Sequence, residues 1–360
     1  MAVDGTWFEG DGGGVGPDRS PAVVRRRKDE LMRRAGSAST VREVFDLLTT
    51  RLPGIVPYSS AVWTAADPDS GLPSSPTLWE AGTSGNRRRW RQDVDRVEVG
   101  DYVALGRIAR STRARRARPR ELRAVLACEN SPWALVSLRR EADERPFTAA
   151  DEQLVAGLSE PLGRQVRRLV RAGLRRAPDG RLPAHPGLLV FDTRLDLVAT
   201  GDDVAPWLSS LGDETHVASA FGLPVPMWVV AAAARALQSA QEGGHGRVGV
   251  RAATMSEQWL FAQASVTRGP DGRPDRVVVA LDAARPSAIA PVIAAAHGIS
   301  VREREVIGHL VTGTGTSAIA DSLGISAHTV RDHMKSILHK FGASSRAEPT
   351  ALLLGTHRPL

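Results

Sequence analysis

One segment near the C-terminal end carries a hydrophobic pattern that few folds can accommodate. Five apolar residues recur there at offsets 0, 4, 7, 8 and 11: Val330, Met334, Ile337, Leu338 and Phe341. This spacing places all five on one face of a helix. Ser326 can accept a hydrogen bond at the start of that helix, and Gly342 can adopt the left-handed conformation that ends it. The pattern predicts a helix from Ala327 to Phe341 with one buried face.

Two shorter helices are expected before this one. Ile319 and Leu323 mark one of them at helical spacing, and Gly324 closes it two residues ahead of Ser326. An earlier helix has a packing side made of Ile307, Leu310 and Val311. Two helices joined by so short a turn must cross steeply, as in a helix-turn-helix. We therefore expect three short helices that share one small core.

The face opposite the apolar stripe is polar, with His328, Arg331, Asp332, Lys335 and His339. Their donors and acceptors suit the base edges of a DNA groove. The segment as a whole resembles the LuxR/FixJ/GerE family of bacterial DNA-binding domains. The residues that match the family pattern are Arg302, Glu303, Glu305, Val306, Gly313, Ile319, Ala320, Ser326, Thr329, Val330, His333, Ile337, Lys340, Gly342, Arg346 and Glu348.

The resemblance implies that the helix from Ala327 to Phe341 enters the major groove of double-stranded DNA. Arg331 and Lys335 would suit guanine O6 and N7, and Asp332 could accept from a cytosine amino group. Thr329 and Lys340 would contact phosphates, which position the protein without reading sequence. The remaining candidates for DNA binding are Ser326, His328 and His333. For His333 two interpretations stay open, a backbone or phosphate contact and a packed structural imidazole.

The sequence departs from the family pattern at two places, and each affects a property that the resemblance implies. Gly315 and Ala318 stand where the family has a Ser or Thr cap and a Glu, so the second helix lacks a capping box and should be less stable. Pro349 lies in what resembles the dimerisation helix; if that helix starts at Ser345, Pro349 lacks the amide that would bond back to its start, and an interior proline costs about 3 kcal/mol, less near a helix end. We expect a homodimer, but dimer contacts through Ala351, Leu352 and Leu353 conflict with this proline.

The chain has 360 residues, which is too long for one compact domain and leaves roughly 300 for two more upstream. A single cysteine, Cys128, excludes an intramolecular disulfide and a clustered thiolate metal site, so we expect a cytoplasmic protein without metal or cofactor. No apolar run is long enough to span a membrane. The net charge of +7 favours a polyanionic partner, although all but three of the 47 basic residues are arginine, as is typical of a GC-rich genome.

The segment from 21 to 177 is expected to be an α+β domain. Two helices within 21–52 precede strands near 58–65, 76–80, 121–127 and 133–139, and Thr148 can cap a long helix from 149 to about 176. The stretch from Trp133 to Arg140, followed by Arg145-Pro-Phe-Thr and an amphipathic helix, resembles a GAF-like sensory domain. Between 102 and 120 lie Arg107, Arg110, Arg113, Arg115, Arg116, Arg118 and Arg120, which favour a solvated helix face over an accessory DNA or nucleotide contact.

The next segment, 186–284, is expected to form two strands, helices and then three strands, an order that resembles a PAS-like sensory domain. A cavity between its sheet and helices would be lined by Trp207, Trp228, Trp259 and Phe261, although aromatic residues at such spacing are more often core. The expected fold is therefore multidomain, with GAF-like and then PAS-like α+β domains followed by an all-α helix-turn-helix. The remaining boundaries are a disordered tail at 1–20, a helical linker at 285–298 and the DNA-binding domain at 299–360.

Three functions were weighed. An enzyme is disfavoured because the nine histidines are scattered, no metalloprotease or serine-nucleophile motif occurs, and Cys128 has no motif-level partner. A sequence-specific transcriptional regulator, controlled by a small-molecule ligand or a partner through its N-terminal domains, fits the motif best. The alternative is a constitutive or non-specific nucleic-acid binder whose sensory domains are degenerate.

Overall fold

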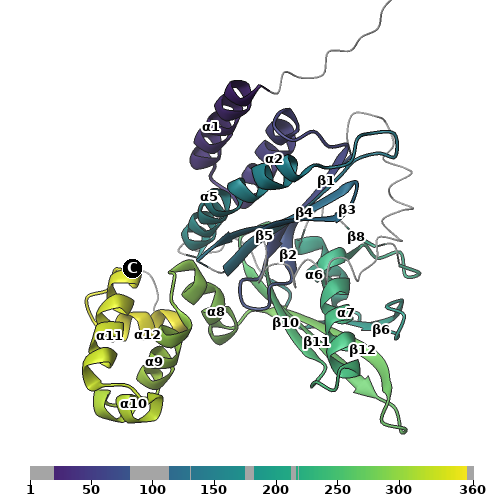
Figure 1. The fold of residues 1–360 in the computed structure, drawn as a ribbon. Helices are drawn as coiled ribbons and strands as arrows, with labels where there is room; N and C mark the ends of the chain where they lie inside the picture. The colour runs from purple at the N-terminus through teal and green to yellow at the C-terminus, as the bar shows by residue number, and fades with distance from the viewer. Residues whose placement is uncertain are drawn as a thin grey trace, which may run out of the picture.

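The computed structural model describes residues 20–81, 113–129, 131–174, 182–211, 216–217 and 219–354. The expected disordered tail lies, apart from residue 20, outside these residues. Three parts follow one another along the chain, two built on β-sheets and a third made of helices (Figure 1). The predicted order, α+β regions followed by an all-α region, is confirmed.

The first part is a five-stranded antiparallel sheet with helices packed on one face (Figure 1). Its helices are α1 (Pro21–Ser37), α2 (Val41–Arg51), the 3-10 turn η1 (Leu52–Gly54) and α5 (Ala149–Gly173). Its strands are β1 (Ser60–Ala66), β2 (Pro73–Ala81), β3 (Ala114–Arg118), β4 (Glu121–Cys128) and β5 (Ser131–Arg139), in the spatial order β2-β1-β5-β4-β3. Phe45, Leu122 and Leu158 are fully or almost fully buried between the helices and the sheet.

The arginine-rich segment corrects one expectation. Residues 114–118 form β3, the edge strand beside β4, and not a helix face. Arg116 there donates to the Glu152 carboxylate of α5 at 2.9 Å. Every residue of β3 after Ala114 is exposed, which suits charged side chains at a sheet edge, where they also discourage pairing with another chain. Arg107 and Arg110 lie outside the described residues.

The long helix α5 is fixed at its start and along its length. Thr148 and Asp151 form a reciprocal capping box, as the sequence predicts for Thr148. The Ser159 hydroxyl donates to the Val125 carbonyl of β4. Further along, a Cβ atom added to Gly163 would lie 2.6 Å from the Ala127 backbone, so glycine permits the close approach of helix and strand.

The second part has a five-stranded antiparallel sheet in the order β10-β11-β12-β6-β7. Its elements are β6 (Gly187–Phe191), β7 (Leu197–Thr200), α6 (Val204–Ser210), β8 (His216–Val217), β9 (Val225–Pro226), α7 (Met227–Gln241), β10 (Arg247–Ala253), β11 (Trp259–Arg268) and β12 (Pro274–Ala283). The predicted five strands are confirmed. Trp207 and Trp228 are buried in the core formed with α6 and α7, which fits the interpretation of these aromatic residues as core. Trp259 is only partly buried and lies at the boundary with the first part.

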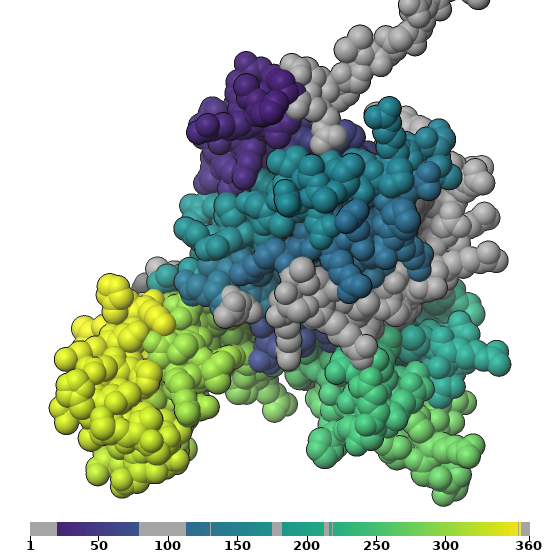
Figure 2. Space-filling view, viewed as in Figure 1, coloured from purple at the N-terminus to yellow at the C-terminus, as the bar shows by residue number. Residues whose placement is uncertain are grey.

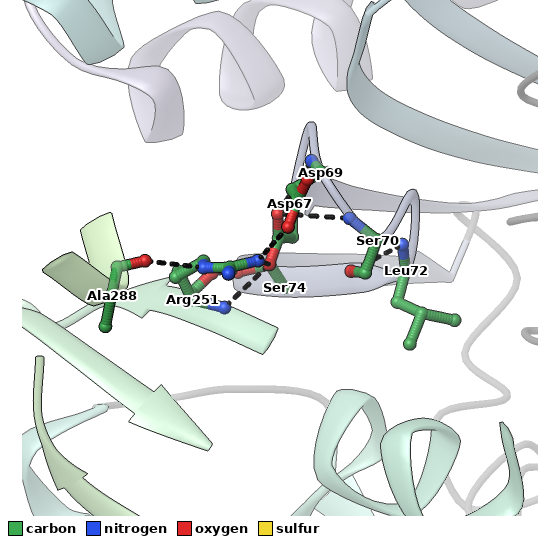
Figure 3. A network of polar contacts seen from close by, with 7 residues as sticks. All are labelled: Asp67, Asp69, Ser70, Leu72, Ser74, Arg251 and Ala288. Atoms are coloured by element: carbon green, nitrogen blue, oxygen red, sulfur yellow. Dashed lines mark hydrogen bonds and ion pairs between the residues drawn. The ribbon is translucent and has the colours of Figure 1, made fainter. Parts of the chain in front are cut away.

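A buried ion pair joins the two sheet-containing parts (Figure 3). The Arg251 guanidinium of β10 donates to the Asp67 carboxylate at 3.1 Å and to that of Asp69 at 2.8 Å. The backbone amide of Arg251 also donates to Asp67, and the Ser74 hydroxyl donates to the Arg251 carbonyl. Burial raises the pKa of Asp67, and the neighbouring Arg251 opposes that change. Hydrogen bonds to both the side chain and the backbone of Arg251 thus hold the first and second parts in one orientation.

Candidate nucleic-acid interface

The C-terminal part consists of α8 (Pro286–Ala296), α9 (Val301–Val311), α10 (Thr316–Leu323), α11 (Ala327–Phe341) and α12 (Ala347–Leu354). In the space-filling view it is a separate lobe, joined to the rest along α8 (Figure 2). The three predicted helices α9, α10 and α11 are confirmed, and four of the five stripe residues pack into their shared core, whereas Leu338 is only partly buried outside it and Val311 of α9 is exposed. That core contains Val306, Ile319, Val330, Met334, Ile337 and Phe341.

Local sequence fixes the ends of these helices. Ser326 accepts a hydrogen bond from the Thr329 amide at 3.0 Å, and Gly342 ends α11 with φ of 67°. Gly324 closes α10 with φ of 64°, a conformation that costs glycine little. No side chain caps the start of α10 at Gly315, as the sequence predicts. The recognition helix is therefore better defined at its start than the helix before it.

The face of α11 opposite the core presents an exposed polar row. Arg331 and Lys335 are exposed and form no hydrogen bond or ion pair with the described residues, so their donors are available to a partner. Asp332 is also exposed and lies 2.9 Å from the His328 imidazole, one helical turn earlier. The interaction is exposed, so it costs little to exchange for another partner.

Of the other predicted site residues, Ser326 is exposed, whereas Thr329, His333 and Lys340 are partly buried. The Thr329 hydroxyl lies 2.9 Å from the Ser326 hydroxyl, and both groups belong to the helix start. His333 is half-buried, between the polar row and the core face. The backbone around Ser326 and Thr329 is nevertheless at the exposed end of α11, where its amide groups point out of the helix.

Lys340 is held by an ion pair within the domain. Its ammonium donates to both oxygens of the Glu303 carboxylate, at 2.9 and 2.7 Å, and the Ser336 hydroxyl donates to the same group. Burial of Glu303 by itself raises its pKa, but the hydrogen bonds from Lys340, Ser336 and Ser300 outweigh burial and lower the pKa to about 2. A phosphate contact by Lys340 would have to share this ammonium group with Glu303.

The end of α11 also contacts the first part of the molecule. The Lys340 carbonyl accepts from an Arg171 guanidinium nitrogen of α5 at 3.4 Å, and His297 Nδ1 lies 3.2 Å from the same oxygen. The His297 ring stacks on Phe341 with 4.4 Å between the centroids. The sequence pattern indicates only that Arg171 lies on the polar face of a connector helix, and it indicates no role for His297, because each meets α11 only through tertiary packing.

The structure corrects the expectation about Pro349. Helix α12 begins at Ala347, so Pro349 falls in the first turn, where backbone amides have no helical acceptor. The Glu348 carboxylate accepts from the backbone amides of Ser344 and Ser345 and so stabilises that turn. Leu353 is buried in the shared core and is covered within its own chain. It does not offer a free surface to a second copy.

Three further features concern metal binding, membrane insertion and the single cysteine, within the part of the chain that the structure describes. No group of three or more His, Cys, Asp or Glu residues in that part could hold a metal ion. Within the same residues, no helix combines the length and the apolar character needed to cross a bilayer. Cys128 is buried, and burial raises the pKa of its thiol, which packs beside Trp133, Val166 and Ala296.

Comparison with known proteins gives two relevant matches. Residues 297–353 match the family model described as "Bacterial regulatory proteins, luxR family". The probable transcriptional regulatory protein SgaR of Hyphomicrobium methylovorum is 38% identical over 60 residues, which span 17% of this chain and 28% of that protein. Both matches cover the C-terminal part alone.

Solved structures resemble larger parts of the chain only distantly. A VqmA–ligand–DNA complex of Vibrio cholera is 19% identical and covers 49% of this chain and 84% of its own, with a TM-score of 0.22. PelD from Pseudomonas aeruginosa PAO1 is 12% identical and covers 77% and 82%, with a TM-score of 0.28. Likeness at these TM-scores carries no argument about fold or function. The conclusion rests on the C-terminal segment: residues 297–353 form a helix-turn-helix domain of the LuxR family of bacterial regulatory proteins.

Proposed function

We propose that this protein is a sequence-specific DNA-binding transcriptional regulator. Helix α11 enters the major groove, and Arg331, Asp332 and Lys335 read base edges. The observation that carries the proposal is the combination of a rigid apolar face with an exposed face whose Arg331 and Lys335 have no partner among the described residues. A helix held in this way presents its donors at fixed spacing, which direct readout requires.

Ser326, Thr329 and His328 lie at the first turn of α11 and are proposed to contact the DNA backbone or the adjacent bases. Lys340 and His333 are proposed as phosphate contacts at the edge of the interface. We expect each to contribute less to DNA affinity than Arg331 or Lys335, since Lys340 is paired with Glu303 and His333 is half-buried. Phosphate contacts position the helix without selecting a sequence.

The regulator is further proposed to bind DNA as a homodimer on an inverted repeat. Leu353 is covered by its own chain, so the dimer would use other surfaces. The segments 21–177 and 186–284 are proposed as GAF-like and PAS-like sensory domains, with 285–298 as the connection to the DNA-binding domain at 299–360. A two-fold footprint with half-sites about 10 base pairs apart would support this arrangement, whereas a single half-site would contradict it.

The test begins with in vitro selection of DNA by the full-length protein, followed by binding titrations on the selected sequence and its single-base variants. Arg331→Ala and Lys335→Ala should each weaken the selected site by about 1–3 kcal/mol and relax the preference at one base pair. Arg276→Ala, which removes an exposed arginine on β12, serves as the matched control and should leave both affinity and preference unchanged. Equal weakening on every sequence would instead identify a non-specific binder.

A further inference from the structure

A cavity of about 280 Å³ lies where all three parts of the molecule meet. The first part contributes the start of α2, the end of β1, the start of β2 and the end of α5. The second part contributes the ends of α6 and β10 and the start of β11, and α8 contributes Val292. The volume is close to the lower end of the range for small-molecule sites, about 300 Å³. It suits an organic molecule of one or two rings.

The cavity wall is mainly apolar. Residues that supply this surface include Val41, Trp133, Leu169, Leu211, Trp259 and Val292. Burial of an apolar ligand against them would be favourable by roughly 25 cal/mol for each Å² removed from water. The wall therefore selects for apolar surface on a ligand.

The charged groups of the wall already have partners. Asp67 is fully buried and is paired with Arg251, whose guanidinium also donates to the Ala288 carbonyl at 2.7 Å (Figure 3). Arg42 and Glu257 each have partners as well. A charged ligand that paired with Asp67 or Arg251 would compete with this buried ion pair, and breaking it would leave the Asp67 carboxylate uncompensated, which is costly. The site consequently favours an uncharged molecule.

We propose that this cavity binds an uncharged, mainly apolar organic molecule of one or two rings. The site lies between the two sheet-containing parts and not inside either one. Binding of the ligand depends on the cavity alone, and only an effect of that ligand on DNA affinity rests on the proposed function. Such an effect would pass through α8, where Val292 lines the cavity and the next residue, Ile293, belongs to the core of the C-terminal part.

The binding test uses the full chain and the neutral two-ring fluorescent probe prodan, 6-propionyl-2-(dimethylamino)naphthalene, without DNA. Gly173 lines the cavity, and an added Cβ there meets nothing within 4 Å, so Gly173→Trp fills the cavity without a backbone clash. Gly36→Trp is the matched control, since Gly36 is also helical and open but lies away from the cavity. Wild type and Gly36→Trp should bind one probe per chain with equal affinity, and Gly173→Trp should bind at least about tenfold more weakly.

Gly173→Ala adds little bulk and should retain probe binding, which separates filling of the cavity from loss of folding. Absence of saturable binding in wild type, or equal binding by Gly173→Trp and Gly36→Trp, would overturn the proposal. Because no DNA is present, neither result bears on the proposed DNA binding.

Discussion

At the scale of single residues, Glu303 links the start of the helix-turn-helix to its end. Its folded-state pKa of about 2 lies below the ordinary value of 4.5 because Lys340, Ser336 and Ser300 bond to the ionised form. Ionised Glu303 therefore stabilises the fold above pH 4.5, and this contribution is lost as the pH falls from about 4.5 towards about 2. Thermal unfolding of the full chain across this range should show the loss.

Glu303→Gln should destabilise the C-terminal part by about 1–3 kcal/mol at pH 7, because it removes charge-assisted hydrogen bonds from a buried position. The substitution should also make the free energy of unfolding depend less on pH between 4.5 and 2. Glu305→Gln is the control, since Glu305 forms an exposed pair with Arg302 and should change stability by less than about 0.5 kcal/mol. Equal effects of the two substitutions would show that burial of Glu303 contributes nothing.

Sequence reasoning succeeds at residues whose role is local. Ser326 and Gly342 end the recognition helix as predicted, because capping and a left-handed turn depend on neighbours within a few positions. The partner of Lys340 could not be predicted in this way. Glu303 is 37 residues away, and only the packing of α9 against α11 brings the two together. The assignment of base-reading roles stays a prediction until DNA binding is measured.

At the scale of elements, α5 depends on one close contact. Gly163→Ala would place a Cβ atom 2.6 Å from the backbone of β4, so helix and strand would have to separate. We expect a loss of about 1–3 kcal/mol, although alanine favours helix. Gly173→Ala in the same helix meets no atom and should be neutral or stabilising by up to about 1 kcal/mol. Chemical denaturation of both variants distinguishes these outcomes, and equal stability would contradict the contact.

The elements also show where sequence patterns mislead. The periodic stripes of α5 and α11 predict their helices with ends within a few residues, because burial on one face leaves a clear period. Strand β3 has no such signal, since most of its residues are exposed arginines at a sheet edge. Its structure is imposed by pairing with β4, which adds hydrogen bonds whatever the side chains. The arginine-rich composition favoured a solvated helix, whereas the segment forms a strand.

At the scale of the whole molecule, Asp67 and Arg251 hold the two sheet-containing parts together. Arg251→Ala would leave the Asp67 carboxylate buried without its partner, and we expect a loss of about 3–5 kcal/mol. Adding Asp67→Ala should restore part of that loss, which a double-mutant cycle measured by calorimetry would detect. Arg276→Ala, which breaks an exposed pair, should have almost no effect. Strictly additive effects at positions 67 and 251 would contradict the assigned pairing.

Helix α8 belongs to more than one core. Ile293 and Ala294 pack with the helix-turn-helix, while Ala296 packs beside Cys128, Trp133 and Val166 of the first part. The family match nevertheless begins at residue 297, after α8 has ended. A fragment cut at that boundary would leave part of its own hydrophobic core behind. The segment that the family model matches is therefore shorter than the hydrophobic unit that it forms with α8, and α8 joins that segment to the first part of the molecule.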